Sequence, residues 1–386
     1  MKKRTIAAGF FIMLCLGSVY SWSVFRKPLE EALGIGAFES GFPFMVLLAM
    51  YSVSMLFSGR IIGRYRHSTL VLIGALLVGA GWMFSGFFSN IWLITFFYGV
   101  LTGAGIGLVY GIPLAAIIER FEKNRGAAMG LVLAGFGISA IITAPLLNYL
   151  IQQYGLAFTF KTAGTAFFFI VALLGFVFKN KHALESGAPG ESGKPLLSFR
   201  GIMTVPGFLP LWLKYYLGVL AGLTAIAITS PVAQETAGLS AKNAGYAVGI
   251  FAFFNGIGRP VFGIVIDKMG FNRAAALNYI IIIAASLLVF AVDAEREAFF
   301  YFAFALLWFS MGGWLAMAPA ATAALFGDGN YQKAYGVIFT AYGAAAITGI
   351  FLSGAIRDLT GNYNYMFVFI IAASAAGLLT GAFKRR

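Results

Sequence analysis

Twelve apolar stretches, each long enough to cross a lipid bilayer as a helix, follow one another along this chain of 386 residues. The hydrocarbon core of a bilayer is about 30 Å thick, and a helix needs about 20 apolar residues to span it. Charged residues or Gly, Pro and Asn mark the ends of the stretches. The predicted spans are residues 5–25, 39–58, 69–88, 91–118, 126–151, 158–178, 206–233, 241–265, 274–292, 298–325, 335–356 and 363–383. We therefore predict an all-α membrane protein with twelve transmembrane helices.

The composition favours lipid rather than water as the solvent of most of the surface. Hydrophobic residues make up 60% of the chain and charged residues 11%, whereas a soluble domain is about half apolar and about a quarter charged. The formal charge of +13 does not indicate nucleic-acid binding, because the basic residues form short clusters between apolar stretches instead of one basic face. We expect the lipid bilayer, and no nucleic acid, as a partner.

The residue types that carry catalysis are scarce in the predicted spans. Both histidines, His67 and His182, fall in predicted loops, and none of the 14 acidic residues falls in the interior of a span on this topology, since Glu39 stands at the very start of one. An enzyme would need a nucleophile, a metal cluster or paired acids there. A channel would normally build a selectivity ring by oligomerisation. We expect neither, but a carrier that works as a monomer without a metal or cofactor.

A polar stretch from Lys179 to Gly201 divides six spans from six and has the composition of a linker. We predict an N-terminal six-helix bundle over residues 1–178, a cytoplasmic linker over 179–205 and a C-terminal six-helix bundle over 206–386. The halves also repeat, since AMGLVLAGFG at 128–137 matches AYGVIFTAYG at 334–343. Two pseudo-symmetric bundles place a substrate site between them near the middle of the membrane.

The placement of lysine and arginine predicts the orientation of the chain. Most of the 27 basic residues lie at the termini and in the even-numbered loops. The opposite side carries Arg26, Lys27, Lys242 at the very start of its span, Arg296 and Arg357, and the interiors of the spans contain Lys161, Lys214 and Arg259. The positive-inside rule then puts both termini in the cytoplasm, and we expect a bacterial plasma membrane. Lys161 and Lys214 lie near helix ends, where we expect their long side chains to reach toward water.

The loop between the second and third spans of the second half carries a signature. The segment GIVIDKMGFNR at 263–273 resembles the G-x-x-x-D-[RK]-x-G-x-[RK]-[RK] loop of the major facilitator superfamily. The matching positions are Gly263, Asp267, Lys268, Gly270 and Arg273. Glycines permit a tight turn at the helix ends, and an acid can pair with bases across the half. The resemblance implies the two-bundle fold of that superfamily and a conformational latch at this loop, while the equivalent loop at 59–68 lacks the acid.

Four other segments narrow the resemblance to one branch. These are GSVYSWSVF (17–25), NGIGRPVFG (255–263), LFGDGNYQKAYGVIFTAYG (325–343) and RDLTGNYNYMF (357–367). They look like the oxalate/formate antiporter and monocarboxylate transporter relatives within the superfamily. The resemblance implies transport of a small carboxylate anion by alternating access, with the proton as the favoured coupling ion.

Arg259 is the predicted substrate-binding cation. It lies eight residues before Asp267, which is about 12 Å along a helix and close to the middle of the bilayer. A charge at that depth costs at least about 2.5 kcal/mol unless it faces water or a partner. In the resembled family, the arginine at the position of Arg259, within the segment NGIGRPVFG, binds the substrate carboxylate. The planar, permanently charged guanidinium suits that task because it can donate two parallel hydrogen bonds.

Five further residues are predicted to surround the substrate with Arg259: Asn255, Tyr20, Tyr110, Trp314 and Tyr342. Tyrosines can hydrogen-bond an anion or form an apolar wall for its carbon chain. Tyr342 stands where the oxalate-transporting branch has a lysine, and Asn255 stands where animal monocarboxylate transporters have an acid. One central cation predicts monocarboxylates such as lactate, moved by proton symport. The alternative is an oxalate/formate-like dicarboxylate antiporter, for which Lys161 or another base would have to reach the cavity.

Overall fold

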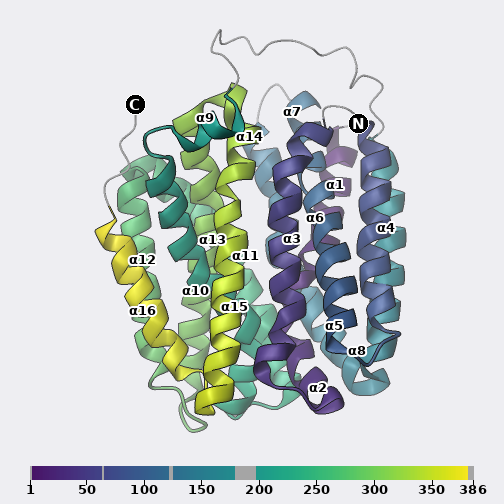
Figure 1. Ribbon diagram of the computed structural model, residues 1–386, viewed down its shortest axis with the longest axis vertical. Helices are drawn as coiled ribbons and strands as arrows, with labels where there is room; N and C mark the ends of the chain where they lie inside the picture. The colour runs from purple at the N-terminus through teal and green to yellow at the C-terminus, as the bar shows by residue number, and fades with distance from the viewer. Residues whose placement is uncertain (1, 63–64, 121–124, 179–196, 381–386) are drawn as a thin grey trace.

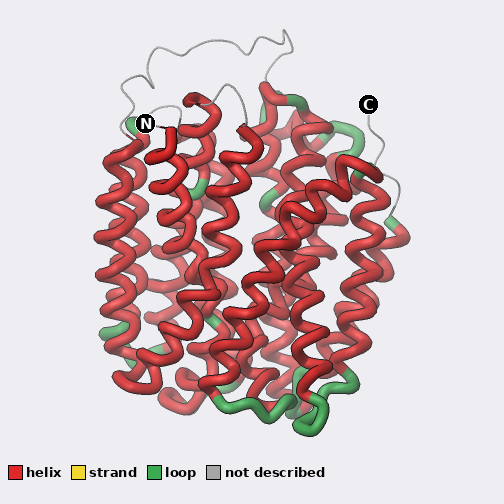
Figure 2. The backbone as a smooth tube through the Cα atoms, turned by 180° about the vertical axis from the view of Figure 1, so that it is seen from behind, coloured by secondary structure: helices red, strands yellow, loops and turns green. Residues whose placement is uncertain are grey.

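The computed structural model describes residues 2–62, 65–120, 125–178 and 197–380, and these ranges contain helices and loops but no strand (Figures 1 and 2). Among the described residues, 10 helices are long and apolar enough to cross a membrane. One of them, Ala128–Phe178, makes two passages in 51 residues, and the shorter apolar helix Asn364–Leu379 makes the last. The prediction of an all-α protein with twelve membrane passages is therefore confirmed.

The helices of the first half run from α1 to α8. They are α1 (Lys2–Gly17), η1 (Ser18–Ser21), α2 (Ser23–Leu33), α3 (Ala37–Ile62), α4 (His67–Ser85), α5 (Ile91–Ile94), the π-helical η2 (Thr95–Thr102), α6 (Gly103–Val109), α7 (Gly111–Arg120), α8 (Arg125–Gly175) and η3 (Phe176–Phe178). The first passage combines α1, η1 and α2. Within α8, Gly155 has φ 80° and ψ 172° and turns the chain back between the fifth and sixth passages. Only glycine adopts such a conformation without a steric penalty.

The second half contains α9 to α16. They are α9 (Phe199–Met203), α10 (Phe208–Glu235), α11 (Ala241–Met269), α12 (Phe271–Val289), α13 (Glu297–Phe326), α14 (Asp328–Ile338), α15 (Thr340–Thr360) and α16 (Asn364–Leu379). The eleventh passage combines α14 and α15. Of the predicted linker, residues 179–196 lie outside the described residues, and the remainder contains the short helix α9.

The two halves stand side by side, with their long helices running between the same two ends of the bundle (Figure 1). Helices α1 to α8 occupy one side of the view and α10 to α16 the other, and the halves meet where α3 packs on α15 and α8 on α11. The start of α1 and the end of α16 lie toward the same end of the bundle, which we call the terminal end, and α2 lies at the opposite, far end. Residues of α3 and α8 that face the second half, and residues of α11 and α15 that face the first half, therefore lie at the interface between the halves.

Glycines allow the helices around this interface to approach closely. A Cβ on Gly312 of α13 would overlap the carbonyl oxygen of Asn255 on α11, and a Cβ on Gly17 would overlap that of Phe136 on α8. Lipid gives no hydrophobic drive for helix association, so close backbone packing of this kind stabilises the bundle. Gly312 therefore fixes the position of α11 at the level of the predicted site.

Two basic residues lie deeper than the sequence predicted. Lys214 is 4% exposed, and its ammonium lies 3.5 Å from the carbonyl oxygen of Gly377 on α16. It does not reach toward the surface, because α10 is enclosed by neighbouring helices. Arg26 was placed on a loop side of the membrane, but the first passage continues as α2 to Leu33 and buries Arg26 completely. The expectation that Lys214 reaches toward water was wrong, whereas Arg26 lies at the far end as predicted but is buried there.

Candidate functional site

Arg259 extends from α11 of the second half to α8 of the first. Its Nη1 donates to the carbonyl oxygen of Leu133 at 2.8 Å, and its Nη2 donates to Asn255 Oδ1 at 3.3 Å. Its Nε is buried and has no hydrogen-bond partner among the described residues. No carboxylate pairs with this cation in the described part of the chain. The guanidinium is therefore held by two neutral oxygens and keeps a free donor.

Asn255 lies one helical turn before Arg259 on the same face of α11, since residues four apart are neighbours on a helix. Its side chain is fully buried, accepts from Arg259 and donates through Nδ2 to the carbonyl oxygen of Trp308 on α13 at 3.3 Å. Both ends of the amide are thus used. Asn255 holds the guanidinium in a fixed orientation toward α8.

Tyrosines from both halves lie beside this cation. The hydroxyls of Tyr20 on η1 and Tyr342 on α15 are 3.0 Å apart, and both residues are almost completely buried. A Cβ on Gly137 of α8 would lie 3.1 Å from the guanidinium carbon of Arg259, and the ring of the preceding Phe136 packs against both Tyr20 and Tyr110, which follows α6. The structure therefore brings together Arg259, Asn255, Tyr20, Tyr110 and Tyr342. A guanidinium, an amide and several phenols can together bind an anion and donate hydrogen bonds to it.

Trp314 is placed elsewhere. Its ring lies 5.2 Å from that of Tyr279 and 6.4 Å from that of Tyr215, and a Cβ on Gly218 would overlap it. These contacts put it in the interior of the second half, and none of its described contacts is with Arg259. Trp308, six residues earlier on α13, lies nearer the site because its ring centre is 6.4 Å from that of Tyr20.

Further aromatic residues, which the sequence analysis did not predict for the site, pack around Tyr20 and Tyr110. The ring of Phe136 on α8 lies 5.2 Å from that of Tyr20 and 5.6 Å from that of Tyr110. Tyr51 on α3 lies 5.5 Å from Tyr110 and 5.0 Å from Phe339, measured between ring centres. The chain contains 17 tyrosines and 40 phenylalanines, so no local pattern distinguishes these from the aromatic residues that face lipid.

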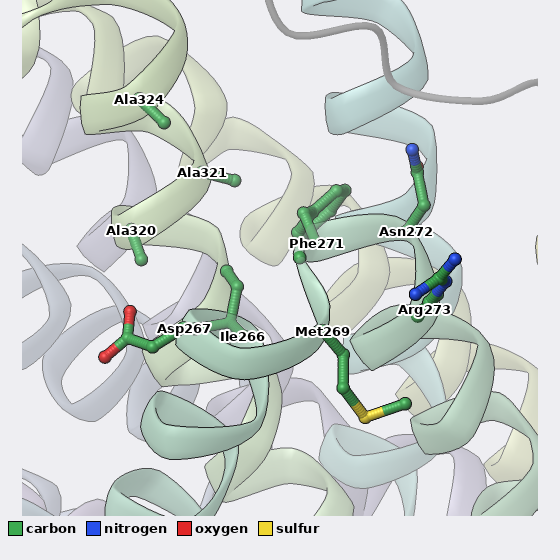
Figure 3. Close-up of a pocket in the computed structure, with 10 residues that line it drawn as sticks. Ile266, Asp267, Met269, Phe271, Asn272, Arg273, Ala320, Ala321 and Ala324 are labelled. Atoms are coloured by element: carbon green, nitrogen blue, oxygen red, sulfur yellow. The ribbon is translucent and has the colours of Figure 1, made fainter.

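The signature loop lies at the terminal end of the second half. Gly270 joins α11 to α12 with φ 76° and ψ 164°. A cavity of about 450 Å³ adjoins the loop and is lined by residues that include Asp267, Gly270 and Arg273. In the view of Figure 3, Asp267 and Arg273 lie on opposite sides of Met269, and the described ion pairs do not include Asp267. A latch formed by Gly263, Asp267, Lys268, Gly270 and Arg273 remains a prediction.

Comparison with known proteins agrees with this architecture. Residues 6–324 match the profile of the Major Facilitator Superfamily. The chain belongs to the major facilitator superfamily. The expected membership is thus confirmed, and the protein is a multi-pass membrane transporter of that superfamily.

Several members of the superfamily resemble the chain over most of its length. It is 26% identical over 371 residues to the oxalate:formate antiporter of Oxalobacter formigenes, covering 94% of this chain and 86% of the relative. It is 26% identical over 364 residues to monocarboxylate transporter 4 of Gallus gallus, covering 91% and 75%. A solved bacterial homolog of the human lysosomal transporter Spinster matches the fold with TM-score 0.71 and 14% identity, covering 98% of this chain and 92% of that chain.

Proposed function

We propose that this transporter moves small monocarboxylates such as lactate by alternating access, in symport with a proton. The observation that carries the proposal is Arg259, a cation between the two halves that has neutral partners and a free Nε. A substrate carboxylate could replace the Leu133 carbonyl oxygen as acceptor, since charge-assisted hydrogen bonds are about twice as strong as neutral ones. Binding would then also loosen the tie between α11 and α8.

The surroundings of Arg259 support a single carboxylate. Of the other bases predicted within spans, Lys161 lies over the ring of Phe87, 4.0 Å from its centre, and Lys214 lies beside Gly377. Neither has a described contact with the residues around Arg259. The aromatic side chains there suit a short apolar carbon chain. A second cation for a second carboxylate is thus missing from the described site.

The alternative remains an oxalate/formate-like antiporter of dicarboxylates. It is favoured by one observation, the similarity over 94% of this chain to a relative named as an oxalate:formate antiporter. For either substrate class we propose that the terminal end faces the cytoplasm of a bacterial cell, as the excess of basic residues at that end indicates.

A thermal-shift experiment on the purified protein separates these possibilities. A ligand at 100 times its dissociation constant stabilises the folded state by about 2.7 kcal/mol. We expect lactate to raise the melting temperature and lactamide, which has the same shape but no carboxylate, to leave it unchanged. Stabilisation by oxalate or malonate but not by lactate would favour the antiporter instead. Counterflow of radiolabelled lactate in proteoliposomes then tests transport itself.

A further inference from the structure

Charged residues connect the two halves at the far end of the bundle. Lys27 on α2 forms an ion pair with Glu235 at the end of α10, and Arg357 on α15 pairs with the same carboxylate at 3.1 Å. The carboxylate of Asp358 accepts hydrogen bonds from the backbone N–H groups of Ala37 and Phe38, both at 2.8 Å. These contacts connect α2 and α3 of the first half to α10 and α15 of the second.

Arg26 lies beneath these contacts and is 0% exposed. Its Nε donates to Ser40 Oγ at 3.0 Å, and its Nη2 donates to the carbonyl oxygen of Ala37. Its Nη1 donates to the carbonyl oxygen of Ala227 on α10 at 3.3 Å, and its Cζ lies 5.8 Å from the centre of the Tyr363 ring. Two partners of the guanidinium thus belong to the first half and two to the second.

The acids near Arg26 are engaged by other groups. Glu30 accepts from Ser40 Oγ at 2.6 Å and pairs with Lys27 at 3.4 Å, while Glu235 pairs with Lys27 and Arg357. Within the described ranges no carboxylate forms an ion pair with Arg26. A completely buried cation held only by neutral oxygens carries an uncompensated desolvation penalty. Such residues in membrane proteins mark functional sites by default.

We propose that Arg26 forms a second carboxylate-binding site, available when the two halves separate at the far end. Separation removes the Ala227 carbonyl oxygen and the Tyr363 ring, while Ser40 and Ala37 keep the side chain in place on the first half. The freed Nη1 then faces the opening, where a carboxylate is a stronger acceptor than the carbonyl it replaces. This inference rests on the proposed transport of a small carboxylate.

The position of Arg26 gives the site a place in the transport path. Arg26 lies six residues beyond Tyr20 on the first passage, which is about 9 Å nearer the far end along a helix. An anion arriving from that end would meet Arg26 before the tyrosines and Arg259. When the halves close again, Ala227 and Tyr363 return to the guanidinium and displace the carboxylate toward Arg259. The two arginines would therefore bind the same anion in succession.

The test measures half-saturating concentrations from each side separately. Proteoliposomes of known sidedness take up radiolabelled lactate from the far end or from the terminal end. We expect Arg26→Gln to raise the far-end half-saturating concentration about tenfold or more, the loss expected for a charge-assisted hydrogen bond. The value from the terminal end should change less than about threefold, because Arg26 is buried when that end is open.

The matched control is Lys27→Gln, which removes the neighbouring ion pair with Glu235 and keeps Arg26. If Arg26 only held the halves together, both variants would favour the state open at the far end, and the far-end value would fall or stay unchanged in both. That result would overturn the proposal, as would equal changes from both sides. If Arg26→Gln does not fold, Arg26→Lys serves instead, since an ammonium retains the charge but not the planar set of donors of a guanidinium. We then expect a smaller rise in the half-saturating concentration, again only from the far end.

The same measurements separate this inference from the proposed function. If the parent protein accumulates no lactate from either side while remaining folded, the proposed function fails. If the parent transports lactate and Arg259→Gln abolishes transport from both sides, but Arg26→Gln leaves both values unchanged, the second site alone fails.

Discussion

The hydroxyl of Tyr20 lies 3.0 Å from the hydroxyl of Tyr342, and this hydrogen bond joins the first half of the transporter to the second. Both rings are buried, Tyr20 against Phe136 and Tyr342 stacked on Phe339 at a centre-to-centre distance of 4.6 Å. A substrate between the halves has to separate these hydroxyls or bind beside them. Under the proposed function, substrate binding would therefore lengthen or break this hydrogen bond or leave the substrate in contact with it.

Replacing Tyr342 by lysine should shift the substrate preference toward dicarboxylates. The ammonium would supply a second cation facing the Tyr20 side of the site, so a second carboxylate would gain an ion pair. The measurement is competition of oxalate and malonate against radiolabelled lactate in proteoliposomes. Tyr342→Phe is the control, because it breaks the same hydrogen bond without adding charge. Equal inhibition by oxalate in both variants would show that residue 342 does not face the substrate.

Replacing Arg259 by lysine should reduce uptake at least about tenfold, which corresponds to about 1.4 kcal/mol. Lysine keeps the charge, but it cannot donate to the Leu133 carbonyl and to Asn255 at once while leaving a planar edge for a carboxylate. The control is Arg296→Lys, since the side chain of Arg296 is 64% exposed in a loop at the far end. Undiminished uptake by Arg259→Lys at equal expression would remove Arg259 from the site.

The sequence predicted the number of passages because the bilayer sets the length of each apolar stretch. It predicted the ends of the passages less well. The first passage was expected to end at residue 25, but α2 continues to Leu33 even though it contains Arg26, Lys27, Glu30 and Glu31. A hydropathy pattern treats these charges as the end of the span. The burial of Arg26 depends on Ser40 and Ala37 of α3 and on Ala227 of α10, which a hydropathy pattern does not take into account.

Part of the site followed from helical spacing, since Asn255 and Arg259 are four residues apart on one helix. Helical spacing could not, however, predict which side of α13 faces the site. Trp308 and Trp314 are six residues apart, so they point about 120° away from each other around a helix of 3.6 residues per turn. A helix that is apolar on all sides gives no sequence signal for its inward face. The sequence therefore could not distinguish Trp314 from Trp308, and Trp308 is the tryptophan whose ring lies near Tyr20.

Adding a methyl group at Gly312 should destabilise the transporter and impair transport. The Cβ of Gly312→Ala would overlap the carbonyl oxygen of Asn255, so α13 and α11 would have to separate next to Arg259. Overpacking of this kind costs about 1–3 kcal/mol. The matched variant is Gly130→Ala, because a Cβ on Gly130 of α8 meets nothing within 4 Å. That variant should gain helix propensity, about 1 kcal/mol. Equal melting temperatures for the two variants would contradict the close packing at Gly312.

Uptake of a monocarboxylate should be driven by an inward proton gradient and should respond little to membrane potential. One anion moving with one proton transfers no net charge, so the roughly 2.3 kcal/mol per charge per 100 mV cannot act on the overall cycle. Arg259 stays with the carrier, and no acidic side chain has a described contact with it that could bring a further proton. Proteoliposomes with equal pH on both sides and an imposed potassium diffusion potential provide the measurement, and liposomes without protein serve as the control. Strong accumulation under those conditions would exclude neutral symport and would favour exchange of anions of unequal charge or coupling to another ion.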